Sequence, residues 1–370
     1  MKILFAIKHL STAVGGAERV LCTIASALVA RGHDVSVLTF DQQSERPFYS
    51  MDERVQLINL GIGNASASAG VIETLKRLRA LRSVIKTERS DIAIGFMHSM
   101  FIPLAIALFG TRIPCVGSEH IVPQHYRQRR LQFFLLLISA SLLKRVTVLS
   151  ETIKATYPRT LQSIMVPISN PIETSDFIEE TAIDKKHSTL LNIGRLDDQK
   201  DQATLIKAFS KIAHEYPNWQ LKIIGEGPLR SELETLIDTL NLKSRITLPG
   251  VTAKIQQEYA AADIFVISSV YEAFGLVTAE AMSHGLPCVG FADCPGTNEL
   301  INHNVSGTLV HPGSSRIDAL ADCLSALMAD SKLQEKLGSA GRDQIRHHLS
   351  TEKICDQWEG MMQEIIADGV

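Results

Sequence analysis

The sequence predicts an α/β protein with two domains, each built on a parallel sheet covered by helices. The chain has 370 residues, more than one average domain holds. Short apolar runs alternate with amphipathic helical stretches along its whole length. These runs are rich in Ile, Val and Leu without strict polar alternation, which is typical of strands buried on both faces of a parallel sheet.

Each half of the chain is expected to contribute six strands. The expected strands are 2–7, 34–40, 55–60, 91–96, 114–118 and 145–150 in the first half, and 189–194, 220–225, 245–248, 263–268, 287–291 and 308–310 in the second.

A segment with two prolines and no helical period separates the halves and indicates a linker. Apolar residues recur at helical spacing near the end of the sequence, from Ile354 and Trp358 to Met361, Met362 and Ile365. We therefore predict four parts. They are a first Rossmann-like domain (1–168), a linker (169–187), a second Rossmann-like domain (188–349) and a helix (350–370) that packs back on the first domain. Loops at the strand ends of both domains are expected to face a common cleft.

The composition is that of a folded protein, with 45% apolar and 21% charged residues. A net charge of −3 argues against a dedicated nucleic-acid binder, so no nucleic-acid partner is expected. The six cysteines form no C-x-x-C pair and have no histidine at zinc-ligand spacing, so we interpret them as buried residues of a reducing compartment.

The apolar start of the chain is too short for a signal peptide, because Lys8 and His9 end it. No uncharged stretch reaches the roughly 18 residues that span a bilayer. The expected location is the cytoplasm, with any membrane contact peripheral and on the cytosolic face.

Two glutamates flank a predicted loop-to-helix turn in the second half. Glu272 follows the strand 263–268, and Glu280 lies in a helix that starts near Leu276. Backbone amides at a helix start carry partial positive charge and can hold a diphosphate. The two carboxylates could then bind hydroxyl groups on either side of it. On this pattern alone, two ordinary surface glutamates remain an equal alternative.

Two cations follow the first strand of the second half. After the Gly194 turn come Arg195 and Lys200, just before a predicted helix. A departing nucleoside diphosphate gains negative charge, which an arginine can grip as a fork and a lysine can offset as a mobile charge. The alternative is a pair of solvated loop charges.

Together these motifs resemble the large retaining glycosyltransferase family 4, which has the GT-B fold. The resemblance covers nearly the whole chain. It rests on the spacing of Glu272 and Glu280, on the Gly194-Arg195…Lys200 element, and on four further motifs: Gly15-Gly16-Ala-Glu-Arg, Gly225-Glu-Gly-Pro, Pro249-Gly-Val and Pro295-Gly-Thr-Asn-Glu. Each motif is weak alone, but their order makes the signal strong.

The resemblance implies roles for individual residues. Glu280 would bind the donor ribose, Glu272 the donor sugar, and Arg195 with Lys200 the diphosphate. Gly16 would bring the backbone of the first domain against that diphosphate. The implied donor-binding set is Gly15, Gly16, Arg195, Lys200, Gly250, Val251, Glu272, Ala273, Phe274, Gly275, Leu276, Val277 and Glu280.

The chain departs from the family pattern at one point. Many members have Lys-Gly after the arginine loop, whereas this chain has Lys200-Asp201. The added acid could weaken phosphate binding, or it could cap the following helix.

His120 matches the family's cleft histidine. The resemblance therefore places it in the catalytic set with Glu272, Arg195 and Lys200. A polar residue satisfied at a strand end is the alternative for His120. His98 and Glu119 are candidates for the acceptor side of the cleft.

No cofactor or metal ion is expected. The segment from Gly225 to Arg230 lacks the third glycine of a dinucleotide fingerprint, so NAD is not predicted. No Asp-x-Asp follows a strand, and Asp197 and Asp198 are adjacent. The cations described above can replace a metal at the diphosphate.

The segment 127–145 is a candidate membrane surface. It has five cations, no acid and many Leu and Phe residues; the cations are Arg127, Arg129, Arg130, Lys144 and Arg145. Such a helix can lie among lipid headgroups with its cations near anionic phosphates. A buried helix with charged ends fits the sequence equally well.

The resemblance implies transfer of a hexosyl or N-acetylhexosaminyl group, with retention, from a nucleotide diphosphate sugar to a hydroxyl of a growing glycan. UDP is the expected nucleotide, and the acceptor can be polyprenyl-lipid-linked, as in polysaccharide or glycoconjugate biosynthesis. Two alternatives remain open: a nucleotide-sugar epimerase of similar fold, and a non-catalytic sugar-nucleotide sensor.

Overall fold

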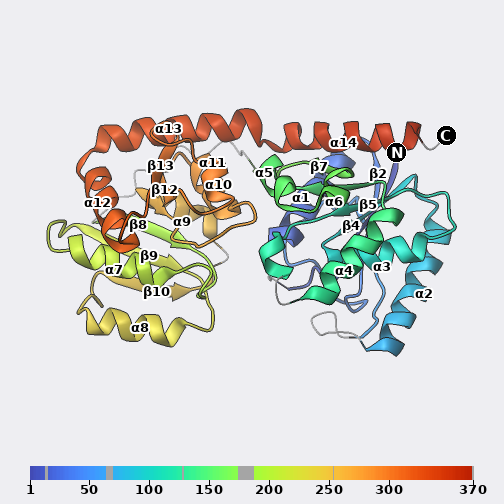
Figure 1. Cartoon of the computed structure of the whole chain (residues 1–370), viewed down its shortest axis with the longest axis horizontal. Helices are drawn as coiled ribbons and strands as arrows, with labels where there is room; N and C mark the ends of the chain where they lie inside the picture. Colours follow the sequence, from blue (N-terminus) through green and yellow to red (C-terminus); the bar gives the residue numbers. More distant parts are fainter. Residues whose placement is uncertain (13–15, 64–69, 127–128, 174–186, 253, 369–370) are drawn as a thin grey trace. The chain divides into compact units, whose positions relative to one another are not determined.

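The computed structural model describes all residues except 13–15, 64–69, 127–128, 174–186, 253 and 369–370. The chain forms two compact units (Figure 1). Unit 1 consists of Met1–Pro171 with Thr351–Val370, and unit 2 of Ile172–Ser350. Most of the predicted linker lies outside the described residues.

Unit 1 contains a parallel seven-stranded sheet in the order β3-β2-β1-β4-β5-β6-β7. Its strands are β1 (Lys2–Ala6), β2 (Asp34–Thr39), β3 (Gln56–Asn59), β4 (Ile92–Phe96), β5 (Cys115–Ser118), β6 (Arg145–Val148) and β7 (Met165–Pro167). Its helices are α1 (Gly16–Ala30), α2 (Val71–Glu88), α3 (His98–Leu108), α4 (Arg130–Ser139), α5 (Glu151–Thr156), α6 (Arg159–Gln162) and α14 (Thr351–Ala367), with short 3-10 turns η1 (Pro123–Tyr126) and η2 (Ala140–Leu142).

Helix α14 returns to unit 1 from the far end of the sequence and packs against α1. The five apolar residues that predicted it are all buried. The Trp358 ring stacks on Phe96 of β4 at a centroid distance of 6.1 Å and meets the Phe5 ring of β1 edge-on at 6.4 Å. The helix thus completes the core over the central strands of the sheet.

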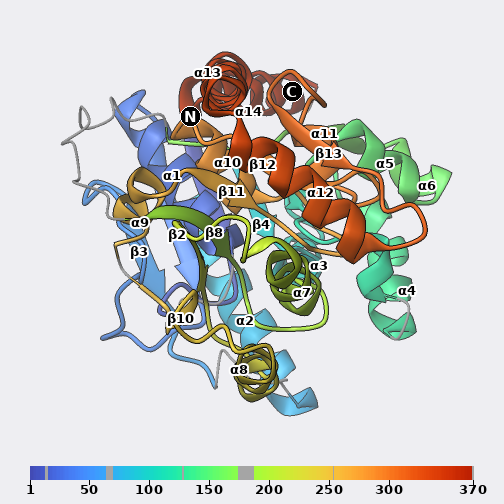
Figure 2. The same ribbon diagram turned by 90° about the vertical axis from the view of Figure 1, so that its left-hand side faces the viewer.

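Unit 2 contains a parallel six-stranded sheet in the order β10-β9-β8-β11-β12-β13. Helices α7, α8 and α12 cover one face, with α9 on the other (Figure 2). The strands are β8 (Ser188–Ile193), β9 (Trp219–Ile224), β10 (Ile246–Gly250), β11 (Ile264–Val266), β12 (Cys288–Phe291) and β13 (Gly307–Val310). The helices are α7 (Gln202–Ile212), α8 (Arg230–Thr239), α9 (Ile255–Ala261), α10 (Leu276–Ser283), α11 (Thr297–Leu300), α12 (Arg316–Ala329) and α13 (Ser331–His348).

The twelve predicted strands all form, with bounds that differ from the prediction by at most two residues. Strand β7 was not predicted from the sequence, because its three residues adjoin the proline-containing segment that indicated a linker. All six cysteines are free, and all except Cys323 are buried. Within the described part of the chain, no helix is both long and apolar enough to cross a membrane.

Each sheet has one point at which its strand order reverses. In unit 1 this point lies between β1 and β4, and in unit 2 between β8 and β11. The connections that leave two such neighbouring strands run to opposite faces of the sheet, which opens a crevice at the carboxyl ends of the strands. The loops after these four strands are therefore where a ligand site is expected.

Candidate active site

The loop after β8 holds Arg195 on a buried acidic support. The Asp197 Oδ2 atom accepts a hydrogen bond from Arg195 Nε at 2.5 Å, and Asp197 Oδ1 accepts one from the Lys200 amide at 3.1 Å. The Arg195 side chain nevertheless keeps 68% of its surface exposed. Asp197 thus orients the guanidinium group and leaves much of its surface available to an anion.

The loop after β11 brings Glu272 to Lys200. The Glu272 Oε1 atom lies 2.6 Å from Lys200 Nζ and also accepts a hydrogen bond from Ser269 Oγ at 2.6 Å. The backbones of the two loops are joined as well, because the Val270 amide donates to Gln199 O at 2.8 Å. Glu272 is only 6% exposed. The predicted cation and carboxylate therefore form one fixed unit at the reversal point of the sheet.

The backbone of Glu272 packs closely against Gly296. Gly296 has φ +79°, and a Cβ atom there would lie 2.6 Å from the Glu272 carbonyl oxygen. The Glu272 amide also donates to Pro295 O at 2.9 Å. The Pro295-Gly296 motif, which the sequence analysis noted without a role, thus supports the glutamate loop.

Gly296→Ala is expected to destabilise unit 2 more than Gly313→Ala does. Gly313 has φ +53°, and nothing lies within 4 Å of its added Cβ. Its variant should therefore show only the left-handed backbone penalty of about 1–2 kcal/mol. Gly296→Ala adds a backbone clash, which raises the loss by about 1–3 kcal/mol. Urea unfolding of the two variants measures the difference, and equal midpoints would contradict the proposed close packing.

Glu280 lies one helix turn into α10 and is held from a different element. The Tyr259 hydroxyl of α9 donates to Glu280 Oε2 at 2.8 Å, and Glu280 is 7% exposed. Gly275 precedes the helix at φ +85°. Of the neighbouring predicted donor-site residues, Phe274 is buried, while Ala273, Leu276 and Val277 are half-buried. The two glutamates thus flank the start of α10.

Asp201 occupies a backbone conformation that glycine adopts freely. Its φ is +46° and its Oδ1 atom accepts a hydrogen bond from the Thr204 amide at 3.3 Å, which caps α7. Asp tolerates this conformation better than most residues do. The structure therefore favours a helix-capping role for Asp201, the residue that stands where many family members have glycine.

Gly250 ends the edge strand β10, and Val251 follows it. They share the carboxyl edge of the sheet with the Arg195 loop, but β9 separates them from β8. Val251 is 78% exposed. A Cβ atom on Gly225, at the end of β9, would lie 1.9 Å from Gly194 O, so this glycine serves close packing of the β8 and β9 ends.

Unit 1 places His98 and Glu119 around a tyrosine that the sequence analysis missed. The Tyr126 hydroxyl lies 2.8 Å from His98 Nδ1 and 2.7 Å from Glu119 Oε2. Burial raises the pKa of Glu119 to about 7, although hydrogen bonds from Tyr126 and the backbone oppose the shift. The Glu119 side chain has no exposed surface. Glu119 thus supports Tyr126 in this structure, and its assignment to the acceptor side of the cleft stays a prediction.

His120 follows β5 and stacks on Phe96 at a centroid distance of 5.1 Å. Its Nε2 atom lies 3.0 Å from Ser118 Oγ, which itself accepts a hydrogen bond from Thr147 Oγ1 at 2.9 Å. The Ser118 hydroxyl thus engages Nε2 and can act there as donor or acceptor. Burial lowers the pKa of His120 to about 4, so the ring is neutral at pH 7.

Gly16 is the first residue of α1, in the connection that follows β1, and Gly15 lies outside the described residues. His98 begins α3 directly after β4. Both positions adjoin the reversal point of the unit 1 sheet. Tyr126, Tyr259 and Ser269 were not among the residues predicted from the sequence. Only Ser269 had a local signal, as a hydroxyl at a strand end three residues before Glu272.

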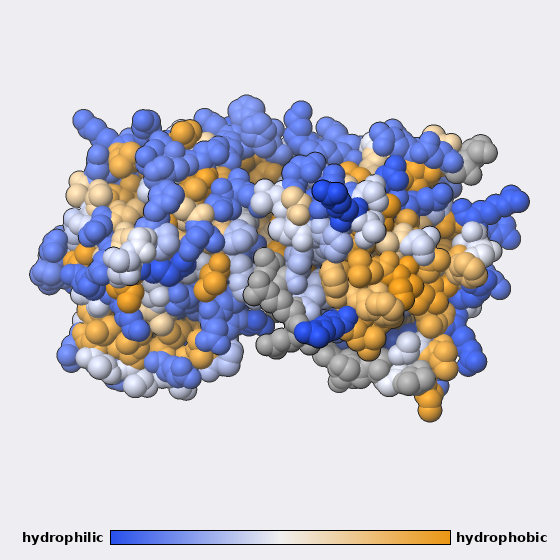
Figure 3. Space-filling view, viewed as in Figure 1, coloured by the Kyte–Doolittle hydropathy of each residue, from blue (hydrophilic) through white to orange (hydrophobic). Residues whose placement is uncertain are grey.

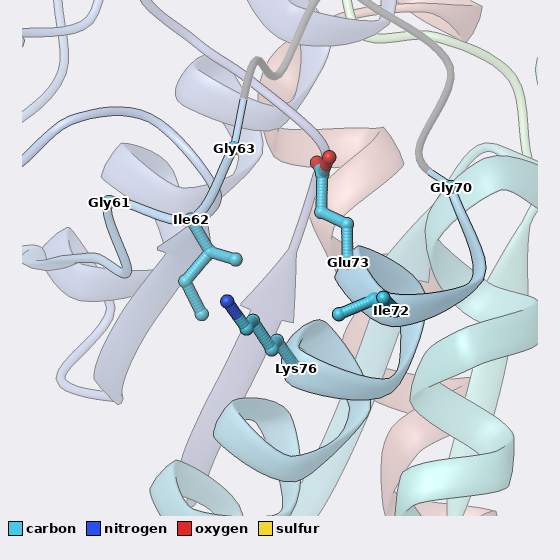
Figure 4. A pocket seen from close by; sticks show the side chains of 7 residues that line it. All are labelled: Gly61, Ile62, Gly63, Gly70, Ile72, Glu73 and Lys76. Carbon is cyan, nitrogen blue, oxygen red and sulfur yellow. The ribbon is translucent and has the colours of Figure 1, made fainter.

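A hollow of about 740 Å³ lies at the start of α2 (Figure 4). It is lined by Gly61, Ile62, Gly63, Gly70, Ile72, Glu73 and Lys76, and none of the predicted site residues is among them. Among the residues that the structure describes, no cluster of three or more His, Cys, Asp or Glu side chains could hold a metal ion.

Both units match models of glycosyltransferase families. A family model described as Glycosyltransferase Family 4 covers residues 14–176, and one described as Glycosyl transferases group 1 covers residues 173–344. An uncharacterized glycosyltransferase of Haemophilus influenzae is 26% identical over 98% of this chain and 99% of its own.

A Campylobacter jejuni relative is 27% identical over 99% of both chains. Its name is GalNAc-alpha-(1->4)-GalNAc-alpha-(1->3)-diNAcBac-PP-undecaprenol alpha-1,4-N-acetyl-D-galactosaminyltransferase.

Two solved structures share the fold. Sucrose-phosphate synthase from Thermosynechococcus elongatus has a TM-score of 0.84 and 21% identity, with full coverage of both chains. Anabaena HepE, solved with UDP and glucose, has a TM-score of 0.79 and 22% identity, covering 98% of this chain and all of its own. Together with the two family models, which span 14–344, these matches show that the chain is a GT4-like glycosyltransferase of the GT-B fold.

Proposed function

We propose that this enzyme transfers a hexosyl or N-acetylhexosaminyl group from a UDP-sugar to a hydroxyl of a growing glycan, with retention and without a metal ion. The observation that carries the proposal is the joining of Arg195, Lys200 and Glu272 at the reversal point of the unit 2 sheet. Arg195 is exposed on its Asp197 support, and Lys200 meets Glu272 at 2.6 Å. This arrangement offers positive charge to a diphosphate and a fixed carboxylate to a sugar.

The donor is held in three places. Glu280, supported by Tyr259, binds the ribose hydroxyls, and the first amides of α10 meet the diphosphate. Glu272 accepts hydrogen bonds from hydroxyls of the donor sugar. Arg195 and Lys200 offset the charge that grows on the diphosphate as the glycosidic bond breaks, which supports a metal-independent reaction.

The proposed chemistry is attack from the face of the departing diphosphate. The bond between the anomeric carbon and the diphosphate oxygen breaks, and the acceptor oxygen forms the new bond on the same face. The acceptor proton passes to the leaving phosphate oxygen. Glu272 is engaged by Lys200 and Ser269, so its assigned role is to hold hydroxyls, and no covalent intermediate on it is needed.

His120 is assigned to the acceptor side of the catalytic set. Its neutral ring, fixed between Phe96 and Ser118, can accept or donate one hydrogen bond to a sugar hydroxyl. His98, held by Tyr126, lies at the end of the neighbouring strand. The undecaprenol-linked acceptor in the name of the Campylobacter relative supports a lipid-linked glycan here, and the UDP in HepE supports a UDP donor.

A panel of nucleotide sugars tests the donor. UDP-sugars are expected to raise the melting temperature and to hydrolyse slowly, with unchanged rates in EDTA. GDP-, ADP- and CMP-sugars should do neither. A rate that collapses in EDTA and returns with Mg²⁺ would contradict metal independence. Interconversion of donor sugars without an acceptor would identify an epimerase, and stabilisation without hydrolysis or transfer would identify a sensor.

A further inference from the structure

Helix α4 carries an apolar stripe that no other described element covers. Leu131, Phe134, Leu135 and Ile138 are 71%, 57%, 41% and 53% exposed. Their spacing of three, one and three residues puts all four on one face of the helix. Only Leu136 and Ser139 of this helix are buried. The sequence alternative of a buried helix is therefore wrong: the apolar face points outward.

The stripe continues onto the neighbouring helix. α3 packs against α4, and Ile106 and Phe109 at the end of α3 are 46% and 70% exposed. Figure 3 shows hydrophobic side chains gathered over α3 and α4 on the face toward the viewer. We call the six residues Ile106, Phe109, Leu131, Phe134, Leu135 and Ile138 the apolar patch. A contiguous exposed patch of this kind marks an interaction site.

The charges on the two segments that carry the apolar patch are all of one sign. Arg129 and Arg130 are exposed at the start of α4, Lys144 is exposed beyond its end, and Arg112 is exposed after α3. Arg145 is half-buried and donates to Lys144 O at 2.9 Å. No Asp or Glu occurs between Glu119 and Glu151, nor between Asp91 and Glu119. Arg127 lies outside the described residues.

We infer that the apolar patch docks on an anionic phospholipid bilayer, with α4 in the plane of the interface. A helix of ten residues cannot span the hydrocarbon core but can bury one face in it. The surrounding cations then lie at the depth of lipid phosphates. A surface that binds a partner protein would be expected to include some acidic side chains of its own. A surface without them is suited to a lipid bilayer, which presents anionic groups throughout.

The docking helix is also in direct contact with the acceptor-side residues. The Phe133 ring of α4 lies 5.6 Å from the Tyr126 ring, and Tyr126 bonds Glu119 and faces His98. A membrane-bound acceptor would therefore arrive at the edge of unit 1 that carries these groups. This last step rests on the proposed function, whereas the docking itself does not.

The first test adds a fluorescent reporter to the full-length protein. Both native tryptophans are buried, Trp219 at 8% and Trp358 at 2% exposure. Phe134→Trp places a new indole on the patch. Its emission is expected to shift to the blue on mixing with vesicles of phosphatidylcholine and phosphatidylglycerol at 7:3, and to shift far less with phosphatidylcholine alone. Phe48→Trp, at a site of equal exposure (58%), should show no shift.

Flotation with the same vesicles tests the contribution of the apolar side chains and that of the cations separately. Leu131→Ser with Phe134→Ser, and Arg129→Glu with Arg130→Glu, are each expected to weaken binding at least tenfold. The controls are Phe48→Ser alone, and Lys243→Glu with Lys254→Glu in unit 2. All three side chains are exposed and none belongs to the patch. These should bind like the wild type. Soluble-donor hydrolysis should be unchanged in all of them, which separates failed docking from failed catalysis.

Three results would overturn the inference. Two of them are wild-type protein that does not float, and patch variants that float equally well. The third is a concentration-dependent dimer in light scattering that Leu131→Ser with Phe134→Ser abolishes, without vesicle binding. That outcome would assign the patch to a second copy of the chain.

Discussion

Glu272→Gln is expected to lower kcat/KM for sugar transfer by roughly 100-fold. The variant keeps the shape of the side chain but removes the charge that Lys200 and Ser269 hold in place. Hydrogen bonds from sugar hydroxyls to a carboxylate are worth about 1.5–3 kcal/mol each, and one or two of them account for this loss. Glu272→Ala should lose at least as much.

Binding measurements show which part of the donor Glu272 meets. Glu272→Gln should bind free UDP at least as well as the wild type, because Glu272 is assigned to the sugar, which free UDP lacks, and its loss frees Lys200 for the diphosphate. Glu280→Gln should lose UDP affinity, because its proposed ligand is the ribose. Calorimetry with UDP and with the UDP-sugar separates the two variants.

The matched control for Glu272 is Glu258→Gln. Glu258 pairs with Lys222 at 2.5 Å elsewhere in unit 2, and its side chain is 20% exposed. Its loss should leave transfer unchanged within about twofold. Near-normal transfer by Glu272→Gln would sink the assignment of this carboxylate to the donor sugar.

Trp358→Ala is expected to cost about 3–5 kcal/mol of unfolding free energy in unit 1. The side chain is 2% exposed and fills the space over Phe5 and Phe96. Phe96 also stacks on His120, so the cavity lies one ring away from the candidate catalytic histidine. Transfer is expected to fall together with stability.

Trp358→Phe separates packing from the indole nitrogen. Trp358 Nε1 has no hydrogen-bond partner in the described part of the chain, so Phe removes volume without breaking a bond. Its cost should stay well below that of Ala. Hydrogen exchange followed by mass spectrometry should show lost protection in β1, β4 and α1 for Trp358→Ala, and unchanged protection in unit 2. Faster exchange in β8 or β11 would contradict the assignment of α14 to unit 1.

The sequence predicted the strands and α14 because both signals are local. Runs of buried Ile, Val and Leu, and apolar residues at helical spacing, need no knowledge of what lies opposite. Arg195, Lys200 and Glu272 were found because each follows a strand within a recognisable motif.

What the sequence could not predict depends on distant contacts. Tyr259 meets Glu280 across 21 positions, and the role of Tyr126 follows only once β4 and β5 lie side by side. The exposure of α4 was open for the same reason. This helix has six consecutive Phe, Leu and Ile side chains, and whether they are buried or exposed to solvent depends on which elements pack over them.

Unit 1 is formed from two separate stretches of sequence, so its last helix is synthesised only after the whole of unit 2. Unit 2 occupies one continuous stretch, so all its residues are synthesised before those of α14. At roughly 5–20 residues per second, the 1–171 segment waits on the order of 10–40 s for the helix that covers Phe5 and Phe96. The second unit in the sequence can therefore begin to fold before the first is complete. Throughout that interval, the nascent chain exposes an apolar surface that a chaperone can recognise.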